Sequence, residues 1–358
     1  MDINEKKIAV AMSGGVDSAV AALLLQKEGY DLLGLTMRLW SETEQLEDDP
    51  CPALDSNARD AAAVAELLGF PHRTVSFGSQ FRRCVVEPFL HSYKRGETPN
   101  PCVDCNKHIK FGALHRAAVE NGCTFLATGH YVRWEQDESG HVWLKKAADT
   151  NKDQSYFLWG LPADLLPHLR FPLGGMTKPE IREIAKQNGI PAASRSDSQD
   201  ICFIPNGDYV SFIEQHDGGV YPPGDFIAAD GRILGRHNGL IRYTVGQRKG
   251  LGIALGAPAF VAKKNAADNT VTLTSDAELY SAKLTAREAN FFADIPLDTP
   301  TRAQVKIRYR HTPALATVVR TEDNRFSVCF DEPQRAIAPG QSAVIYDGDT
   351  VLGGGIID

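Results

Sequence analysis

Hydrophobic positions in the first half of the chain form short apolar runs that alternate with longer segments of helical spacing. Short runs of this kind are typical of buried parallel strands, and we expect strands at Lys7–Met12, Leu32–Leu39, Arg73–Phe77 and Phe125–Thr128. The spacing predicts helices at Ser18–Glu28, Ala58–Leu68, Ser79–Lys94, Ile109–Asn121 and Lys178–Asn188. This alternation predicts a doubly wound α/β domain with a parallel sheet, here residues 1–200, whose ligand binds outside the carboxyl ends of the strands.

After about Ser198 the pattern changes to short alternating runs separated by Gly, Pro, Asn and Asp, which is typical of β-rich domains. We expect central strands at Tyr243–Gly246, Ala259–Lys263 and Thr270–Thr274. Further strands are expected at Val305–Tyr309, Leu315–Arg320, Arg325–Phe330 and Ser342–Tyr346. The pattern predicts a small β-rich central domain at 201–280 and a C-terminal β-barrel at 281–358.

Composition narrows the class of protein. The chain has 358 residues, of which 43% are hydrophobic and 23% charged, as in ordinary globular proteins. We see no signal peptide, no transit peptide and no apolar run long enough to cross a membrane. Seven cysteines, an odd number, favour reduced thiols in the cytoplasm.

The net charge is −7, but the charge is unevenly distributed. Gly231–Ala267 holds seven basic and no acidic residues, Thr301–Arg320 holds five more basic residues, and Glu42–Asp55 is an acidic block. Local basic stretches rather than net charge attract a nucleic-acid backbone. Solvated faces of β-hairpins explain the same stretches equally well.

The segment Ser13–Ser18, Ser-Gly-Gly-Val-Asp-Ser, connects the first strand to the first helix. Gly14 and Gly15 allow backbone N–H groups to close on an anion at a helix N-terminus, and Ser13, Asp17 and Ser18 add groups that could cap the helix or hold Mg²⁺. The loop is typical of enzymes that cleave ATP between the α and β phosphates, and it differs from the Gly-x-x-x-x-Gly-Lys-Ser/Thr loop. A glycine turn with a capped helix is the alternative.

Three cysteines are candidates for chemistry. Cys102 and Cys105 lie in a proline-rich loop before the helix expected at Ile109, near lysines that lower a thiol pKa, and Cys202 lies in a polar loop. Half of a zinc knuckle is the alternative for Cys105, and a buried core thiol is the alternative for Cys202. An Fe–S cluster on the three cysteines is also chemically reasonable.

Segments spread over the whole chain resemble the bacterial tRNA-specific 2-thiouridylase family, which thiolates the wobble uridine of certain tRNAs and belongs to the PP-loop ATP pyrophosphatases. The segments that carry the resemblance are Ala11–Ser18, Thr98–Asn106, Ala127–Arg133, Lys152–Leu158, Asp200–Ile204, Tyr243–Gly252, Lys306–His311 and Pro339–Gln341.

The resemblance implies roles for individual residues. Those that match the ATP site are Ala11, Met12, Ser13, Gly14, Gly15, Val16, Asp17, Ser18, Met37 and Gly129. Cys105 matches the nucleophile and Cys202 the persulfide carrier, while Asn100, Pro101 and Cys102 match the segment that touches the target base. Those that match tRNA contacts are His130, Lys152, Asp153, Gln154, Arg308, Tyr309 and Gln341.

The implied reaction uses ATP with Mg²⁺ to adenylate uracil O2, and a persulfide on Cys202 to replace that oxygen, with a Cys105–Cys202 disulfide as by-product. Its implied partners are the tRNA anticodon stem-loop and a sulfur-donor protein. We expect a monomer, no membrane partner and no permanently bound metal. Some family members carry an acid where this chain has Cys102, so we assign no proton transfer there.

Other classes remain open on the sequence alone. The same loop occurs in ATP-dependent amide and C–N ligases, which need no reactive cysteine in the synthetase domain. A tRNA thiolase that depends on an Fe–S cluster is a second alternative. A tRNA-binding module without enzymatic activity is a third, but it leaves the ATP loop and the cysteines unexplained.

Overall fold

The structure is a computed structural model that describes residues 4–39, 56–191, 201–204, 207–296, 298–322 and 324–358. The acidic block at Glu42–Asp55, Cys51 and Asp200 therefore lie outside the described residues. Backbone contacts divide the chain into two compact units. Unit 1 comprises residues 1–85, 102–199 and 349–351, and unit 2 comprises residues 86–101, 200–348 and 352–358.

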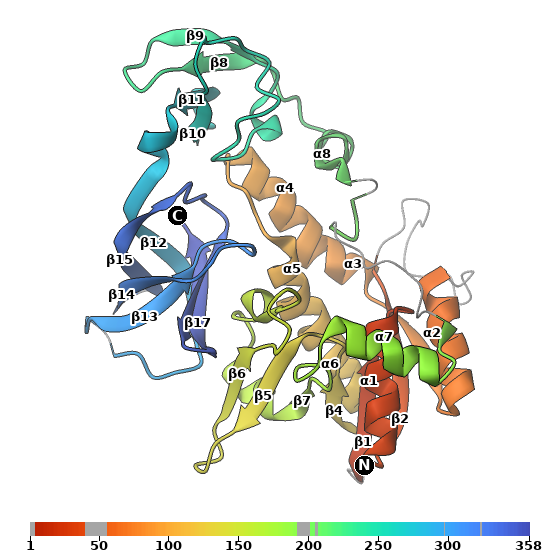
Figure 1. Cartoon of the computed structure of the whole chain (residues 1–358). Coiled ribbons are helices and arrows are strands. Elements are labelled where there is room, and N and C mark those ends of the chain that lie inside the picture. The colour runs from red at the N-terminus through yellow and green to blue at the C-terminus, as the bar shows by residue number, and fades with distance from the viewer. Residues whose placement is uncertain (1–3, 40–55, 192–200, 205–206, 297, 323) are drawn as a thin grey trace. The chain divides into compact units, whose positions relative to one another are not determined.

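Unit 1 is built on the expected parallel sheet, which confirms the predicted fold class. Its strand order is β3-β2-β1-β4-β7, and each neighbouring pair is parallel (Figure 1). The bounds are β1 Asn4–Ala11, β2 Asp31–Arg38, β3 His72–Ser76, β4 Cys123–Ala127 and β7 Leu169–Arg170. The order reverses between β1 and β4, and a ligand is expected to bind at such a switch point.

Helices cover the sheet from both faces. Helices α1 (Val16–Lys27), α2 (Ser56–Leu68) and α7 (Lys178–Gln187) share one apolar cluster with Ile8 and Val10 of β1. Ala9, also fully buried, lies outside that cluster, as the alternation of side chains along a strand requires. Helix α6 (Leu114–Glu120) packs on β4 and β1 without joining the cluster, so it covers the opposite face.

Two predicted helices have different bounds in the structure. The segment predicted at Ser79–Lys94 is divided into α3 (Gly78–Phe81), the π-helical turn η1 (Arg82–Val86) and α4 (Glu87–Lys94). The helix predicted to begin at Ile109 begins at Pro101, because α5 (Pro101–Asp104) and the π-helical segment η2 (Cys105–Ala113) precede α6. The loop assignment of Cys102 and Cys105 was therefore wrong. Proline is well suited to the first turn of a helix, where it needs no amide hydrogen.

The rest of unit 1 includes structure that the sequence pattern did not reveal. A hairpin of β5 (Val132–Gln136) and β6 (Val142–Lys146) follows the loop after β4. The short helices η3 (Ser155–Phe157) and η4 (Ala163–His168) connect it to β7.

The central part of unit 2 contains a four-stranded sheet of order β10-β11-β8-β9. Its strands are β8 (Gly224–Ile227), β9 (Ile233–His237), β10 (Phe260–Asn265) and β11 (Thr270–Thr274), preceded by helix α8 (Tyr209–Asp217). The strand predicted at Tyr243–Gly246 was wrong, since this segment follows the 3₁₀ turn η7 (Leu240–Arg242) and turns at Gly246, where φ is +87°. Tyr243 is nevertheless buried in the core of this domain.

The remainder of unit 2 is a closed antiparallel barrel, as predicted. Strands follow the order β12-β15-β14-β13-β16-β17, and pairing of β12 with β17 closes it. The bounds are β12 Tyr280–Phe291, β13 Thr301–Lys306, β14 Ala314–Thr321, β15 Arg325–Arg335, β16 Ser342–Asp347 and β17 Thr350–Ile357, and the 3₁₀ turn η8 (Asp276–Leu279) precedes them. The strand predicted at Val305–Tyr309 ends at Lys306, so Arg308 and Tyr309 lie in the turn that follows β13.

Helix α4 belongs to unit 2, although the sequence on either side of residues 86–101 belongs to unit 1. Its buried Phe89 meets Phe203 and Phe212 edge-on, at centroid distances of 5.5 and 6.3 Å. Tyr93 stacks on Tyr209 of α8 at 5.1 Å. These aromatic contacts fix α4 to the segment that contains Cys202 and to α8.

Lys264 gives unit 2 a testable dependence on pH. Its ammonium lies 5.8 Å from the Tyr93 ring centre and 3.4 Å from the Glu97 carbonyl oxygen, and burial lowers its pKa from 10.5 to about 8. Between these values the unfolded chain binds more protons than the folded one, so stability rises with pH over that window, by at most about 3 kcal/mol. We expect denaturant midpoints between pH 8 and 10 to rise for the native protein. K264M should flatten this rise, and K263M, at the exposed neighbouring position, should retain it.

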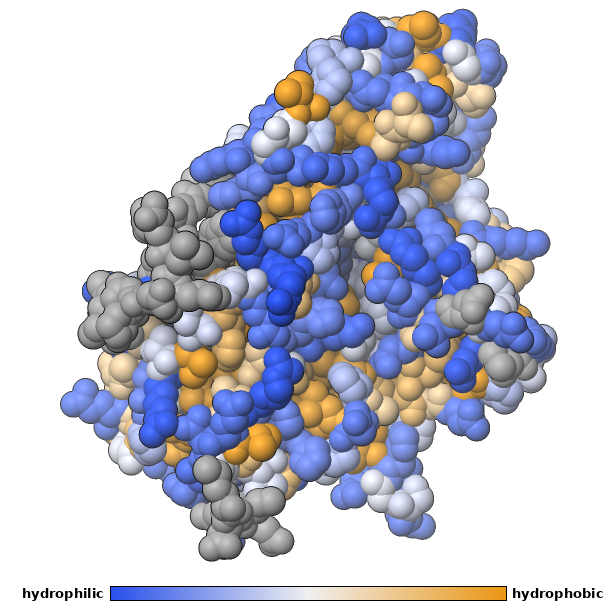
Figure 2. All heavy atoms as spheres, turned by 180° about the vertical axis from the view of Figure 1, so that it is seen from behind, coloured by the Kyte–Doolittle hydropathy of each residue, from blue (hydrophilic) through white to orange (hydrophobic). Residues whose placement is uncertain are grey.

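No helix in the part of the chain that the structure describes is both long and apolar enough to cross a membrane. On the face in Figure 2, hydrophobic side chains are interspersed among hydrophilic ones. The exposed large hydrophobic side chains of the described residues lie on different elements and are Leu67, Val119, Val220, Ile233, Tyr280 and Leu315.

Candidate ATP site and reactive cysteines

The loop after β1 is held in place by bonds from its own residues. The Ser13 amide donates to Ser18 Oγ at 3.2 Å, and Ser18 Oγ donates to the Gly15 carbonyl oxygen at 3.0 Å. Gly15 is the N-cap of α1, and no side chain caps this helix. Of the two roles considered for Ser13, Asp17 and Ser18, the structure therefore does not show the helix cap, and the first-turn amides are left for an anion at the helix N-terminus.

Asp17, in the first turn of α1, is bound by donors from two other elements. Lys178 Nζ lies 2.8 Å from each carboxylate oxygen, and the Tyr131 hydroxyl donates to Oδ1 at 2.7 Å. Lys178 is only 6% exposed. Because the Lys178 ammonium balances the charge of this carboxylate and would repel a second cation, the site does not suit a protein-held Mg²⁺. The ion would have to arrive with the phosphates of ATP.

Tyr131 is itself positioned by Gln154. The Tyr131 backbone amide donates to the side-chain oxygen Oε1 of Gln154, and the Gln154 backbone amide donates to the Tyr131 carbonyl oxygen, both at 2.9 Å. The neighbouring Asp153 is buried and accepts bonds from the Ala147 and Ser155 amides. Both side chains therefore organise the loop that contains Tyr131, and the neighbouring Lys152 is half-buried.

Gly129, which follows β4, lies against the start of α1. A Cβ atom on Gly129 would lie 2.9 Å from the Asp17 carbonyl carbon and 3.0 Å from the Ser18 amide nitrogen. Met37 is half-buried near the end of β2. The carboxyl ends of β1, β2 and β4 thus bring Met12, Met37 and Gly129 to one edge of the sheet.

This close approach gives a prediction for G129A. The added methyl group would push the backbone of Asp17 and Ser18 away from its place in the loop, so we expect KM for ATP to rise by about tenfold or more. G175A is the matched control, because nothing lies within 4 Å of a Cβ at Gly175. AMP formation measured over a range of ATP concentrations checks both variants, and an unchanged KM for G129A would remove Gly129 from the nucleotide site.

Thr36 and His72 support the loop from below, and the sequence pattern gave no sign of either. Thr36 Oγ1 donates to the Met12 carbonyl oxygen at 2.8 Å, so its oxygen accepts from His72 Nε2, also at 2.8 Å. Burial lowers the pKa of His72, which favours the neutral ring with its proton on Nε2. The pair fixes the carbonyl group at which the phosphate loop begins.

His130 is buried rather than exposed to a partner. Its Nδ1 pairs with Thr128 Oγ1 at 2.7 Å, and its ring lies 5.5 Å from that of Phe111. Burial, with the charge of Lys110, lowers the pKa of His130 well below its ordinary value, so the ring is neutral near pH 7. In this structure its side chain is part of the core.

The cysteines of unit 1 differ in exposure. Cys102 is exposed in α5, whereas Cys105 is buried at the first position of η2 with 6% of its surface accessible. Next to it, buried Asn106 donates to the Phe157 carbonyl oxygen at 3.2 Å, while its Oδ1 accepts no hydrogen bond from the residues that the structure describes. π-Helical segments are rare in proteins, and those that occur are often found at functional sites.

Cys202, in unit 2, is exposed in a turn. The next residue, Phe203, packs edge-on against Phe89 of α4 and Phe212 of α8 at centroid distances of 5.5 and 5.3 Å. The apolar residues after Cys202 therefore anchor it, and its thiol remains accessible. Among the six described cysteines no disulfide is formed.

The remaining residues that match tRNA contacts also lie in unit 2. Arg308 donates to the Arg335 carbonyl oxygen at 3.0 Å, and Tyr309 lies beneath the Lys306 ammonium, 5.5 Å from its ring centre. Gln341 Nε2 donates to the Thr98 carbonyl oxygen at 2.8 Å. Both Arg308 and Gln341 thus make internal bonds, and all three side chains remain partly exposed.

The basic stretches seen in the sequence are partly neutralised in space. Arg236 pairs with Asp225 at 2.8 Å, and Arg242 pairs with Glu214 at 2.6 Å. In the second stretch Arg302 pairs with Asp331 at 2.6 Å. Within these two stretches, the exposed cations for which the described residues show no carboxylate partner are Arg248, Lys249, Lys263 and Arg310.

Within the described ranges, no group of three or more His, Cys, Asp or Glu side chains is arranged to hold a metal ion.

Three family models match successive parts of the chain. Residues 6–206 match the tRNA methyl transferase HUP domain, residues 211–275 the tRNA methyl transferase PRC-barrel domain, and residues 281–357 the Aminomethyltransferase beta-barrel domain. A curated protein from Clostridioides difficile (strain 630), named tRNA-specific 2-thiouridylase MnmA, is 44% identical over 355 residues, 99% of this chain and 98% of that protein. The chain belongs to the tRNA-specific 2-thiouridylase family.

A second 2-thiouridylase, MnmA of Geotalea uraniireducens (strain Rf4), is 46% identical over 358 residues, covering 99% of this chain and 95% of its own. Among solved structures, the U34-tRNA thiolase NcsA from Methanococcus maripaludis with its [4Fe-4S] cluster is 19% identical, with a TM-score of 0.35 over 60% of this chain and 66% of its own. A likeness at that score carries no argument for this chain. Membership in the 2-thiouridylase family rests on the relatives that match over the full length.

Proposed function

We propose that this protein transfers sulfur to C2 of the wobble uridine of tRNAs of the Lys, Glu and Gln type, in a reaction that consumes ATP. The observation that carries the proposal is the phosphate loop at Ser13–Ser18, with uncapped amides at the start of α1, in a chain that matches 2-thiouridylases over its full length. The cytoplasm is the predicted compartment, where the cysteines would stay reduced.

ATP activates the base in the first step. Uracil O2 attacks the α-phosphorus, the bond from that phosphorus to the bridging oxygen breaks, and pyrophosphate leaves with its Mg²⁺. The amides of the loop stabilise the charge on the leaving group. Ala11 to Ser18, Met37 and Gly129 form the nucleotide site, and Lys178 supplies the positive charge that balances Asp17.

Sulfur replaces the activated oxygen in the second step. Cys202 carries a persulfide delivered by a donor protein, and its terminal sulfur attacks C2, either directly or as sulfide released when the Cys105 thiolate attacks the inner sulfur. AMP leaves with the former uracil oxygen. The electrons balance when Cys105 and Cys202 end as a disulfide, which a cellular thiol reduces before the next cycle.

The tRNA is held by the anticodon stem-loop. Asn100, Pro101 and Cys102 would meet the target base, which is turned out of the stack so that the ATP and sulfur sites can reach it. Lys152, Arg308, Tyr309 and Gln341 would contact the tRNA, and the unpaired cations Arg248 and Lys249 would supply phosphate contacts. The chain would act as a monomer with three domains at 1–200, 201–280 and 281–358.

The test is to incubate the protein with unmodified transcripts of tRNA-Lys, tRNA-Glu and tRNA-Gln, Mg²⁺, α-labelled ATP and sulfide. We expect 2-thiouridine in the digested nucleosides, together with one labelled AMP for each thiouridine formed. ATP turnover to AMP without thiouridine would reject the proposal in favour of an amide or C–N ligase. Activity that depends on bound iron would instead favour an Fe–S-dependent thiolase.

A further inference from the structure

The residues directly before the Pro99–Pro101 segment are held by several parts of unit 2. The Thr98 amide donates to the Pro339 carbonyl oxygen, and the Thr98 carbonyl oxygen accepts from Gln341 Nε2, both at 2.8 Å. The Glu97 amide donates to the Ser92 carbonyl oxygen at 2.9 Å, which closes the end of α4. Both backbone groups of Thr98 are thus bound to the barrel.

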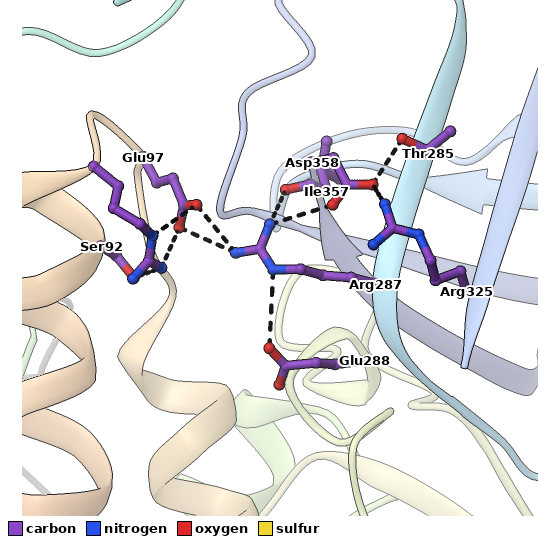
Figure 3. A network of polar contacts seen from close by, with 9 residues as sticks. Ser92, Glu97, Thr285, Arg287, Glu288, Arg325, Ile357 and Asp358 are labelled. Carbon is purple, nitrogen blue, oxygen red and sulfur yellow. Dashed lines mark hydrogen bonds and ion pairs between the residues drawn. The ribbon is translucent and has the colours of Figure 1, made fainter. Parts of the chain in front are cut away.

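The Glu97 carboxylate is held by two arginines. Arg95 donates through Nε at 3.1 Å and through one terminal nitrogen at 2.8 Å, and Arg287 Nη2 reaches the two oxygens at 3.2 and 3.1 Å (Figure 3). Burial alone raises the pKa of Glu97, but the bonds and charges of both arginines outweigh it and lower the pKa below its ordinary value. Glu97 is therefore ionised, with 14% of its side chain exposed.

Arg287 connects Glu97 to the last residues of the barrel, Ile357 and Asp358. It lies on β12, and its Nη1 points to the Ile357 carbonyl oxygen and the Asp358 carboxylate, each at 3.4 Å. Arg325 and Thr285 bind the same Asp358 carboxylate, but neither reaches Glu97 (Figure 3). Arg287 is the side chain of this network that bridges the barrel and Glu97, in the segment that follows α4.

The backbone approach at this junction is close enough to require glycine. Gly340 has φ of +88°, and a Cβ atom there would lie 2.9 Å from Glu97 Cβ and 2.9 Å from the Thr98 amide nitrogen. On the other side, Lys264 Nζ of β10 lies 3.4 Å from the Glu97 carbonyl oxygen. The barrel therefore holds both Glu97 and Thr98, and the central domain holds Glu97 as well.

We propose that Arg287 is a positioning residue for thiolation, which holds Glu97 and Thr98 on the barrel and thereby sets the place of the segment that meets the target base. The inference deepens the proposed function and rests on it. Pro99 and Pro101 restrict φ and the residues before them, so a fixed Thr98 leaves Asn100 little freedom. Pro101 also begins the helical stretch that contains Cys105, so the same anchor sets the start of that stretch.

The contacts are poorly suited to a role in stability alone. Arg287 is 24% exposed, and partly exposed ion pairs contribute about 1 kcal/mol or less. An error of about 1 Å in the position of a reacting group, by contrast, costs up to about 100-fold in rate. Loss of the bridge should therefore lower turnover much more than it lowers stability.

The test compares R287Q with R325Q, a matched change at the other arginine on Asp358. With saturating ATP and sulfide, we expect R287Q to lower kcat for tRNA thiolation by about tenfold or more, because the base segment is displaced. Its Kd for tRNA by filter binding and its thermal midpoint should stay near those of the native protein. R287K should recover part of kcat, and R325Q should stay within about twofold.

Three results would overturn the inference: native kcat in R287Q, an equal loss in R325Q, or a loss explained by weaker tRNA binding. If R287Q fails to fold, E97Q tests the same bond from its other side, because it removes the carboxylate that Arg287 binds, and native kcat in E97Q would likewise overturn the inference. Native protein that makes no thiouridine would instead refute the proposed function. The two failures are therefore distinguishable.

Discussion

Replacing Cys105 by serine is expected to lower 2-thiouridine formation by at least about a thousandfold. Without this thiolate the sulfur of the persulfide cannot be released, so the other catalytic groups no longer contribute to the rate. Transfer from a persulfide-loaded donor should fail in the same way in C202S, because sulfur can no longer be carried on that residue. Nucleoside mass spectrometry after a single turnover measures both. In the native protein, peptide mapping without reductant should then show a Cys105–Cys202 disulfide.

Two other cysteines provide matched controls for these changes. Cys84 lies in the π-helical turn η1 and so resembles Cys105 in its local backbone, and Cys329 is exposed on β15 and so resembles Cys202 in its accessibility. C84S and C329S should retain activity within about threefold. Full activity in C105S with a persulfide donor would contradict the proposed sulfur transfer, whatever the controls show.

The second large effect is expected at Lys178. Without its ammonium, the Asp17 carboxylate remains as an uncompensated negative charge in the proposed ATP site, where it would repel the phosphates. We expect K178M to slow tRNA-dependent AMP release from α-labelled ATP by about 100-fold, the range found when one preorganised electrostatic group is removed. K178R should retain more activity than K178M, because the charge persists.

Lys186 is the control for Lys178, because it lies on the same helix but is exposed. K186M should release AMP at nearly the native rate. Its thermal midpoint shows whether replacing a lysine on α7 is enough to destabilise the protein. An AMP release rate for K178M within a few-fold of native would show that Lys178 serves the fold and not the ATP step.

The sequence was sufficient to predict the parallel sheet and the barrel, because their buried strands produce regular apolar patterns. Strand β11 lies at Thr270–Thr274, as predicted, and both ends of β2 lie within one residue of the prediction. The strand predicted at Tyr243 was wrong, because this residue is buried as a strand residue would be but lies just after a 3₁₀ turn. Periodicity reports burial, and it cannot distinguish strands from well-packed turns.

The residues of the candidate site could be predicted only where they lie together in one short segment of the sequence. The loop at Ser13–Ser18 is such a segment, whereas Lys178 meets Asp17 across 161 positions and Tyr131 meets it across 114. No local pattern encodes such pairs. The π-helical segment around Cys105 was also missed, because its composition is that of an ordinary helix after a proline turn. The structure likewise assigns Gln154 and Asp153 internal bonds that the motif match did not reveal.

The membership of α4 in unit 2 has a consequence for biosynthesis. Residues 86–101 leave the ribosome early, but Pro339 and Gln341, which hold Thr98, are synthesised about 240 residues later. At about 5–20 residues per second, that delay amounts to roughly 10–50 s. The aromatic residues that cover Phe89 and Tyr93 are Phe203, Tyr209 and Phe212, which follow about 115 residues later, so this apolar face has no native partner for roughly 6–25 s at the same rate and is open to chaperones that shield hydrophobic helices.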